Sequence, residues 1–149
     1  WRVPNLLLQK FPAPFFTAGA KMTFHPRLVG EKAGLVVMGK EWGYLAMHRT
    51  GSGQELAMCA GTYFQGYDKT ETIESIGLEN DSCYLRVTVG HRANYHFSYS
   101  LDGETYHPIG RECQATAGTW IGAKVGLFAI NPNLQDGAGH ADFDWFRIE

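Results

Sequence analysis

Apolar and polar residues alternate along much of this chain, and this period of two is the feature that most limits its possible folds. The alternation runs through residues 20–25, 84–89 and 94–101; in the stretch YLRVTV, for example, Leu85, Val87 and Val89 share one face. Successive side chains of a β-strand point to opposite faces, so each stretch predicts a half-buried strand. No stretch of the sequence carries an apolar stripe at helical spacing for three turns. We therefore expect an all-β protein.

Continuous apolar runs and glycine-rich turns indicate how these strands are arranged. The runs AGLVVMG, YLAMH, ELAMCAG and VGLFAI suit strands at the centre of a sheet, buried on both faces. Turn residues separate the runs at intervals of about ten residues, the spacing typical of a sandwich. The stretch LDGE at residues 101–104 predicts a tight hairpin, because Asp-Gly tolerates positive φ. The pattern predicts one two-sheet antiparallel β-sandwich over residues 1–149, without internal repeats.

Composition narrows the class of protein and its partners. The chain has 149 residues, of which 44% are hydrophobic and 19% charged, so it can bury a substantial core and is not a disordered chain. Its net charge is -2 and it has no basic cluster, so neither nucleic acid nor a membrane surface is an expected partner. No apolar run approaches the roughly 20 residues of a membrane span. The start lacks an initiator Met, and we expect the chain to be part of a longer or processed protein.

Cysteines and histidines give no metal-site or disulfide signature. Cys59, Cys83 and Cys113 form no CxxC pair and are odd in number, which favours three unpaired thiols over one disulfide and a free thiol. The six histidines have no zinc-type spacing, and we interpret them as surface or turn residues. No metal ligand is assigned from histidine or cysteine. The thiols leave the compartment open, with a secreted or periplasmic location slightly favoured.

Paired acids are the candidates for catalysis. Asp142 and Asp144 share one face of a predicted strand, roughly 6–7 Å apart by strand rise, which is compatible with the carboxylate separation of glycoside hydrolases. Glu71 and Glu74 would lie on opposite faces if their stretch is a strand. No further acid or basic group accompanies Asp142 and Asp144, and the sequence has no GxSxG nucleophile motif. We therefore assign no catalytic residue.

A structural role suits Asp142 and Asp144 better. Carboxylates at the edge of a terminal strand can accept hydrogen bonds from loop N–H groups, which would tie the strand to the loop at residues 131–140. They can also ligate Ca²⁺, which prefers oxygen ligands, with Asn131, Asn133 and Asp136 of that loop as further donors. A structural Ca²⁺ is thus the one cofactor that the sequence leaves open.

Aromatic residues beside glycine turns are the candidates for ligand binding. Trp42, Tyr44 and Trp120 each adjoin such a turn, where a large ring is hard to bury completely, and residues 61–69 add further rings. Sugars present apolar C–H faces that lie against aromatic rings, while polar neighbours bind the hydroxyls. We therefore predict Trp42, Tyr44 and Trp120 as carbohydrate-binding residues. The alternative is that these rings cap the ends of the sandwich core.

Six segments, in order, connect the chain to a known family. They are NLLLQKF, KMTFHP, GEKAGLVVMGKEWGYLAM, FSYSLDGETYHPIG, GAKVGLFA and the closing ADFDWFRIE. Together they resemble the C-terminal concanavalin A-like β-sandwich domain, a jelly roll, of family 43 glycoside hydrolases, the β-xylosidase and arabinofuranosidase group. The resemblance covers residues 5–149, and its most specific pieces are GEKAGL, FSYSLDG and ADFDWF.

The resemblance implies a non-catalytic role. In that family the catalytic acids belong to a separate five-bladed propeller ahead of the sandwich, and nothing in this chain matches the propeller. The implied function is an accessory domain that binds xylan or arabinoxylan, either polysaccharide or oligosaccharide, with the catalytic propeller of the same parent hydrolase as a second partner. One alternative is a purely structural domain that buttresses the propeller. Another is a sandwich-fold glycosidase or lyase that uses Asp142 and Asp144.

Overall fold

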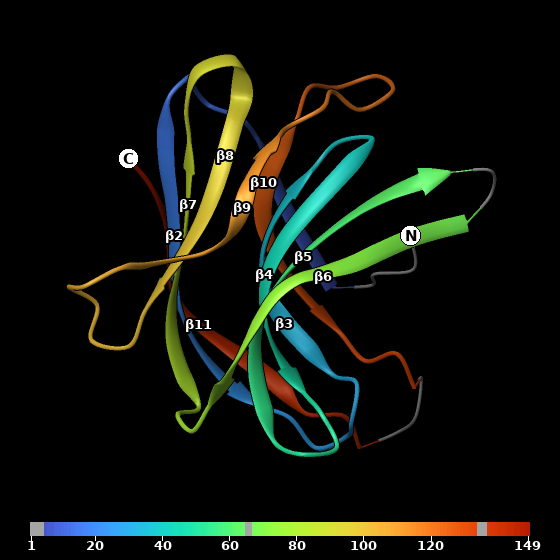
Figure 1. The fold of residues 1–149 in the computed structure, drawn as a ribbon, viewed down its shortest axis with the longest axis vertical. Helices are drawn as coiled ribbons and strands as arrows, with labels where there is room; N and C mark the ends of the chain where they lie inside the picture. Colours follow the sequence, from blue (N-terminus) through green and yellow to red (C-terminus); the bar gives the residue numbers. More distant parts are fainter. Residues whose placement is uncertain (1–4, 65–66, 134–136) are drawn as a thin grey trace.

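The computed structural model describes residues 5–64, 67–133 and 137–149, and it consists of two antiparallel β-sheets packed face to face (Figure 1). The six-stranded sheet has the order β1-β10-β3-β4-β5-β6, and the five-stranded sheet has the order β11-β2-β7-β8-β9. A single 3-10 turn, η1 (His91–Ala93), interrupts the strands of the described part. The expected all-β, two-sheet sandwich is confirmed. In chain order the strands are β1 (Asn5–Lys10), β2 (Phe16–His25), β3 (Lys32–Met38), β4 (Glu41–Arg49), β5 (Gln54–Phe64), β6 (Tyr67–Leu78), β7 (Ser82–Val89), β8 (Asn94–Ser100), β9 (His107–Gln114), β10 (Lys124–Ile130) and β11 (His140–Ile148).

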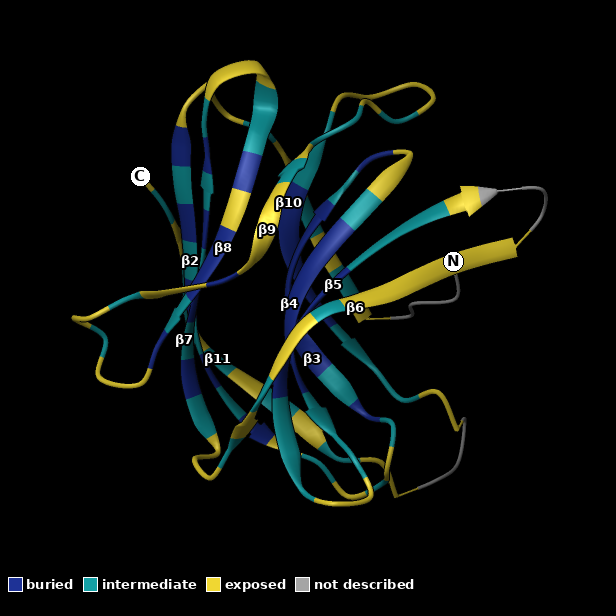
Figure 2. Ribbon diagram, viewed as in Figure 1, coloured by how far each residue is buried: buried dark blue, intermediate teal, exposed yellow. Residues whose placement is uncertain are grey.

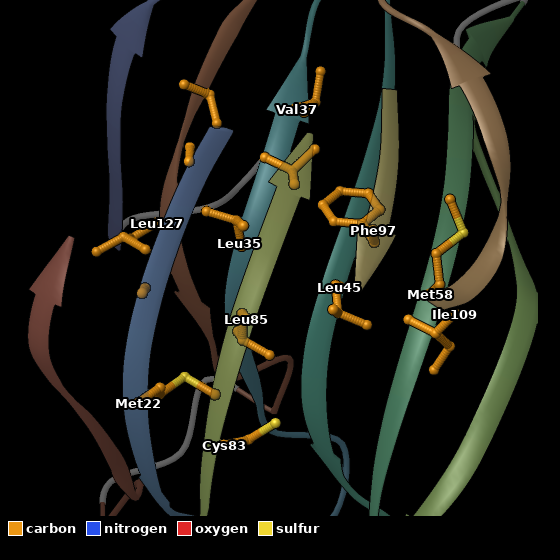
Figure 3. Close-up of a cluster of buried hydrophobic side chains, with 14 of the residues drawn as sticks. Met22, Leu35, Val37, Leu45, Met58, Cys83, Leu85, Phe97, Ile109 and Leu127 are labelled. Atoms are coloured by element: carbon orange, nitrogen blue, oxygen red, sulfur yellow. The ribbon is translucent and has the colours of Figure 1, made fainter. Parts of the chain in front are cut away.

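Alternation places one face of the five-stranded sheet in the core. Every second residue of β2, from Phe16 to Phe24, is buried, and β7 alternates in the same way (Figure 2). These side chains meet those of the other sheet, where Leu35, Leu45 and Met58 are fully buried (Figure 3). Each large apolar side chain removed from water contributes about 1.5–3 kcal/mol. The core between the sheets is therefore the main source of stability.

A second apolar layer covers the outer face of the six-stranded sheet. Val36 lies between the core residues Leu35 and Val37 in β3, so its side chain points away from the other sheet. Its buried neighbours on this face are Tyr44, Ala46, Ala57, Cys59 and Phe128. Because both faces of β3, β4 and β10 are apolar, these strands appear in the sequence as continuous runs of apolar residues. We call this layer the outer cluster.

The LDGE stretch connects β8 to β9, as expected, but the connection is longer than a tight hairpin. Six residues, 101–106, separate the paired strands. Asp102 Oδ1 accepts hydrogen bonds from the N–H groups of Glu104 and Thr105, both at 2.8 Å, and Gly103 has φ +83°. The side chain of Asp102, together with the positive φ of Gly103, therefore shapes this turn.

All three cysteines are free, with Cys59 and Cys83 buried and Cys113 partly exposed. Cys83 lies in the core between the sheets, where burial raises the pKa of its thiol to about 12. Such a thiol stays protonated and unreactive at neutral pH. Within the described residues, no helix is long and apolar enough to span a bilayer.

Candidate functional site

An open hollow of about 680 Å³ lies at one end of the six-stranded sheet. Trp120 stands beside it with 93% of its surface exposed, on the loop between β9 and β10 that is orange in Figure 1. The exposed side chains of Tyr63 and Ile121 line the same hollow. Lys40 and Lys124 add positive charge at its wall. We call this site the Trp120 hollow.

Close backbone packing fixes the loop that carries Trp120. A side chain at Gly39, in the turn between β3 and β4, would collide with the carbonyl oxygen of Thr116. The Thr116 hydroxyl in turn accepts a hydrogen bond of 2.9 Å from the N–H of Glu41. The start of the loop is therefore fastened to the β3–β4 turn, which sets the position from which the loop presents Trp120.

Trp42 lies on the outer face of β4 and is only partly exposed. Its indole covers Gly61 of β5, where any side chain would collide with the ring. The ring packs against the outer cluster from its edge. Trp42 therefore acts at least in part as a packing residue of the sheet.

Tyr44 is buried, with 7% of its surface exposed, so the expectation that its ring is accessible is wrong. Its ring packs edge-on against Phe128 at a centroid distance of 5.2 Å, and its hydroxyl lies 3.3 Å from Lys32 Nζ. Burial raises the pKa of its phenol far above the ordinary value. The glycine beside Tyr44, Gly43, belongs to strand β4 and not to a turn. Side chains of the neighbouring strands pack against the ring. Carbohydrate binding by Trp42, Tyr44 and Trp120 stays a prediction, and of these rings Trp120 is the most exposed.

His48 is also less exposed than the sequence suggested. It lies on the outer face of β4 with its ring stacked on Tyr44, and burial together with nearby Lys32 lowers its pKa to about 4. His48 is therefore neutral at physiological pH.

The two C-terminal acids lie on β11 next to β2. Asp144 Oδ2 accepts a hydrogen bond of 2.6 Å from Lys21 Nζ, and this contact raises the pKa of Lys21. The register of β11 against β2 shifts between Phe143 and Trp145, so Asp144 occupies a β-bulge. Asp142 lies 3.5 Å from His25 Nε2 and 3.7 Å from His140 Nε2. Both acids therefore contact β2, and Asp142 also contacts the residue at which the preceding loop ends.

Glu31, which the sequence analysis did not single out, ties down this loop. It is buried, 3% exposed, and its carboxylate accepts three backbone hydrogen bonds, from Arg27 (2.7 Å), Leu28 (3.1 Å) and Gly139 (2.8 Å). Burial alone would raise the pKa of this carboxyl, but the three N–H donors outweigh it and lower the pKa. The sign of this role in the sequence is a single acidic residue between Gly30 and the apolar strand β3. In the structure, Gly30 has φ +94°.

Several of the predicted Ca²⁺ ligands make other contacts in the structure. Asn131 Oδ1 accepts the N–H of Asn133 at 3.0 Å, and Asn133 Nδ2 donates to the carbonyl of Val29 at 2.8 Å. Asp144 holds Lys21, and Asp136 lies outside the described residues. A structural Ca²⁺ stays a prediction.

Glu71 and Glu74 lie on the same side of β6, contrary to the simple alternation. Strand β6 has one extra residue, Ile73, opposite the Met58–Cys59 step of β5, and this bulge reverses the facing of the residues before it. Because they share this side, both acids contact β9 in the other sheet. Glu71 lies 3.2 Å from the guanidinium of Arg111, and Glu74 accepts the N–H of Gly110 at 2.7 Å. They join the two sheets at this edge of the sandwich.

Comparison with known proteins identifies the family. Residues 1–149 match the family model described as the beta xylosidase C-terminal concanavalin A-like domain. The chain is 27% identical to a xylan 1,3-beta-xylosidase from a Vibrio species over 96% of the chain and 28% of that protein. It is 29% identical to a putative beta-xylosidase of Escherichia coli K12 over 90% of the chain and 27% of that protein.

A solved structure shares the fold over almost the whole chain. The GH43 protein BlXynB from Bacillus licheniformis superposes with a TM-score of 0.80 at 24% identity, over 99% of this chain and 30% of that one. The chain thus spans less than a third of the length of these relatives. By its full-length match to the family model, the chain belongs to the C-terminal concanavalin A-like domains of GH43 β-xylosidases.

Proposed function

We propose that this chain is a non-catalytic accessory domain of a hemicellulose-degrading glycoside hydrolase and binds xylan-type glycans in the Trp120 hollow. The observation that carries the proposal is the position of Trp120, a ring 93% exposed beside an open hollow. Large exposed aromatic surface is costly in water and is typical of binding sites. The relatives named for xylosidase activity support xylan-type chains as the ligand class.

The lining of the hollow suits a sugar. The faces of Trp120 and Tyr63 can take the apolar C–H surface of a pyranose ring. Thr119, Lys40 and Lys124 provide donors for hydroxyl groups. A polysaccharide ligand also accords with the expected secreted or periplasmic location, which stays a prediction.

Binding of the 149-residue chain to xylan, arabinan and cellulose, by calorimetry or affinity electrophoresis, tests the proposal. Trp120→Ala should weaken xylan binding by about tenfold or more, equivalent to roughly 1.4 kcal/mol, because a few aromatic anchors carry most binding energy. Phe15→Ala is the matched control, since Phe15 is another exposed ring but does not line the hollow. Both variants should melt as the wild type does. Absence of glycan binding by the wild type would refute the proposal.

A second candidate function is docking against the catalytic part of the parent hydrolase. Met38 and Ile121 bring aliphatic surface to the Trp120 hollow, and a partner domain would cover such surface better than a hydrated sugar would. In that case Trp120→Ala should lower the melting temperature of the full-length parent while leaving the isolated chain unchanged. Glycan binding by the isolated chain that needs Trp120 would favour the first function.

A further inference from the structure

Three potential metal ligands meet where β11 begins beside β2. Asp142 Oδ2 lies 3.5 Å from His25 Nε2 and 3.7 Å from His140 Nε2. The two imidazole rings are 4.7 Å apart at their centroids and tilted by 32°. One ligand atom from each residue lies within 4.8 Å of the other two, and all three side chains are exposed. The cluster is separate from the Trp120 hollow, none of whose lining residues it contains.

The strand register brings these residues together across 115 positions of sequence, from 25 to 140. His140 is paired directly with His25 in the antiparallel ladder, and Asp142 is paired with Thr23 two positions along. Directly paired residues have Cβ atoms about 4.5–5.5 Å apart on the same face of the sheet. Residues 140 and 142 also share a face, since the bulge of β11 follows them.

The buried side chain of Glu31 holds the backbone next to His140 in place. Gly139 donates its N–H to the buried carboxylate of Glu31 at 2.8 Å. Any side chain at Gly139 would collide with the carbonyl oxygen of His25, so the two histidine-bearing segments approach closely. Ligands on rigid, supported backbone need little reorganisation to bind an ion.

Two of the three distances between ligand atoms are close to those around a bound zinc ion. Zinc takes imidazole nitrogen and carboxylate oxygen at about 2.0–2.2 Å, which places two ligands of a tetrahedral ion roughly 3.4 Å apart. The observed separations of 3.5 and 3.7 Å are close to this value. Two imidazoles and one carboxylate favour a zinc-type ion over Ca²⁺, which prefers oxygen donors. The next acid along β11, Asp144, is engaged by Lys21 and does not compete for the ion.

We propose that His25, His140 and Asp142 form a site for one divalent transition-metal ion of the zinc type. The exposure of the three side chains leaves the remaining coordination positions to water or to an external ligand. Bound metal would clip the start of β11 to the end of β2, and so stabilise the folded chain.

Titration of the tag-free 149-residue chain with Zn²⁺ tests this site. Calorimetry should show one zinc ion per chain, and zinc should raise the melting temperature by mass action. His25→Ala, His140→Ala and Asp142→Asn should each weaken zinc binding by at least about 10- to 100-fold, the loss seen when even outer-shell partners are removed. Co²⁺ in place of zinc should give an absorption spectrum of a nitrogen- and oxygen-bound ion that His25→Ala abolishes.

Two matched variants serve as controls. His96→Ala removes another exposed histidine of the same sheet, and Asp144→Asn removes the neighbouring acid of β11. Both should bind zinc as the wild type does. The proposal is overturned by unsaturable zinc binding, by equal binding of wild type and His25→Ala, or by one zinc per two chains with a dimer in sedimentation.

Discussion

At the residue scale, Glu31 shows how much one buried side chain can organise. Its carboxylate joins the segment at residues 27–28 to the start of β11 through three backbone N–H groups. Sequence reasoning instead expected Asp142 and Asp144 to tie the last strand to the loop at residues 131–140, because carboxylates at a strand edge can accept hydrogen bonds from loop N–H groups. Glu31 was missed because its long-range partner, Gly139, lies 108 positions away in the sequence and becomes a neighbour only in the folded chain. The exposure of Trp120, by contrast, followed correctly from its place in a glycine-rich loop.

Replacing Glu31 tests this role. Glu31→Gln should lower the free energy of unfolding by about 1–3 kcal/mol, since it weakens charge-assisted bonds to buried donors. Asp144→Asn, which removes only an exposed ion pair, should cost less than about 1 kcal/mol. Urea unfolding of the two variants at neutral pH compares them, and equal losses would contradict the assignment.

The pH dependence of stability provides a second check on Glu31. Its folded-state pKa is lowered, so its stabilisation is complete above the unfolded-state pKa of about 4.3 and is lost as the pH falls through the folded-state pKa. The stability difference between the wild type and Glu31→Gln should therefore shrink on acidification below pH of about 4. A difference that is constant from neutral to acid pH would show that the carboxylate charge is unimportant.

At the element scale, strand positions could be predicted and strand irregularities could not. Alternation located β2, β7 and β8, and apolar runs located β3, β4, β5 and β10, because burial on one or two faces leaves a direct trace in the sequence. The bulges at Ile73 and Asp144 leave no such trace, since an extra residue changes the facing without changing composition. The bulge at Ile73 explains why Glu71 and Glu74 share a side of the sheet.

The contact between the β3–β4 turn and the Trp120 loop can be tested with glycines. Gly39→Ala should destabilise the chain by about 1–3 kcal/mol, because its Cβ would overlap the backbone of Thr116 and force the loop away. Gly51→Ala, in another exposed turn with open space around it, should change stability by less than about 0.5 kcal/mol. Urea unfolding measures both. A mild effect of Gly39→Ala would mean that the loop is free to move.

At the scale of the whole molecule, the sandwich devotes its inner surfaces and much of one outer face to packing. The outer cluster buries Tyr44 and half-buries Trp42, whereas Trp120 and Tyr63 expose their rings beside the hollow at the end of the six-stranded sheet. The order of the family segments was enough to predict the fold. The meeting of His25 with His140 could not be predicted, since it depends on the register between the second and the last strand.

The contacts of four acids lead to a prediction for the whole chain. Glycoside hydrolysis needs two carboxyl groups flanking the scissile bond, one able to give a proton and one ionised. In the described part, Glu71 holds Arg111, Glu74 binds the backbone of Gly110, Asp144 holds Lys21 and Glu31 is buried under three N–H groups. The isolated chain should therefore show no turnover of aryl xylosides or xylo-oligosaccharides above the uncatalysed rate, with or without added zinc. If turnover is found, the variants Asp142→Asn and Glu71→Gln test whether an acid of the sandwich is catalytic. Loss of activity in either variant would establish a catalytic acid in the sandwich itself and contradict the prediction.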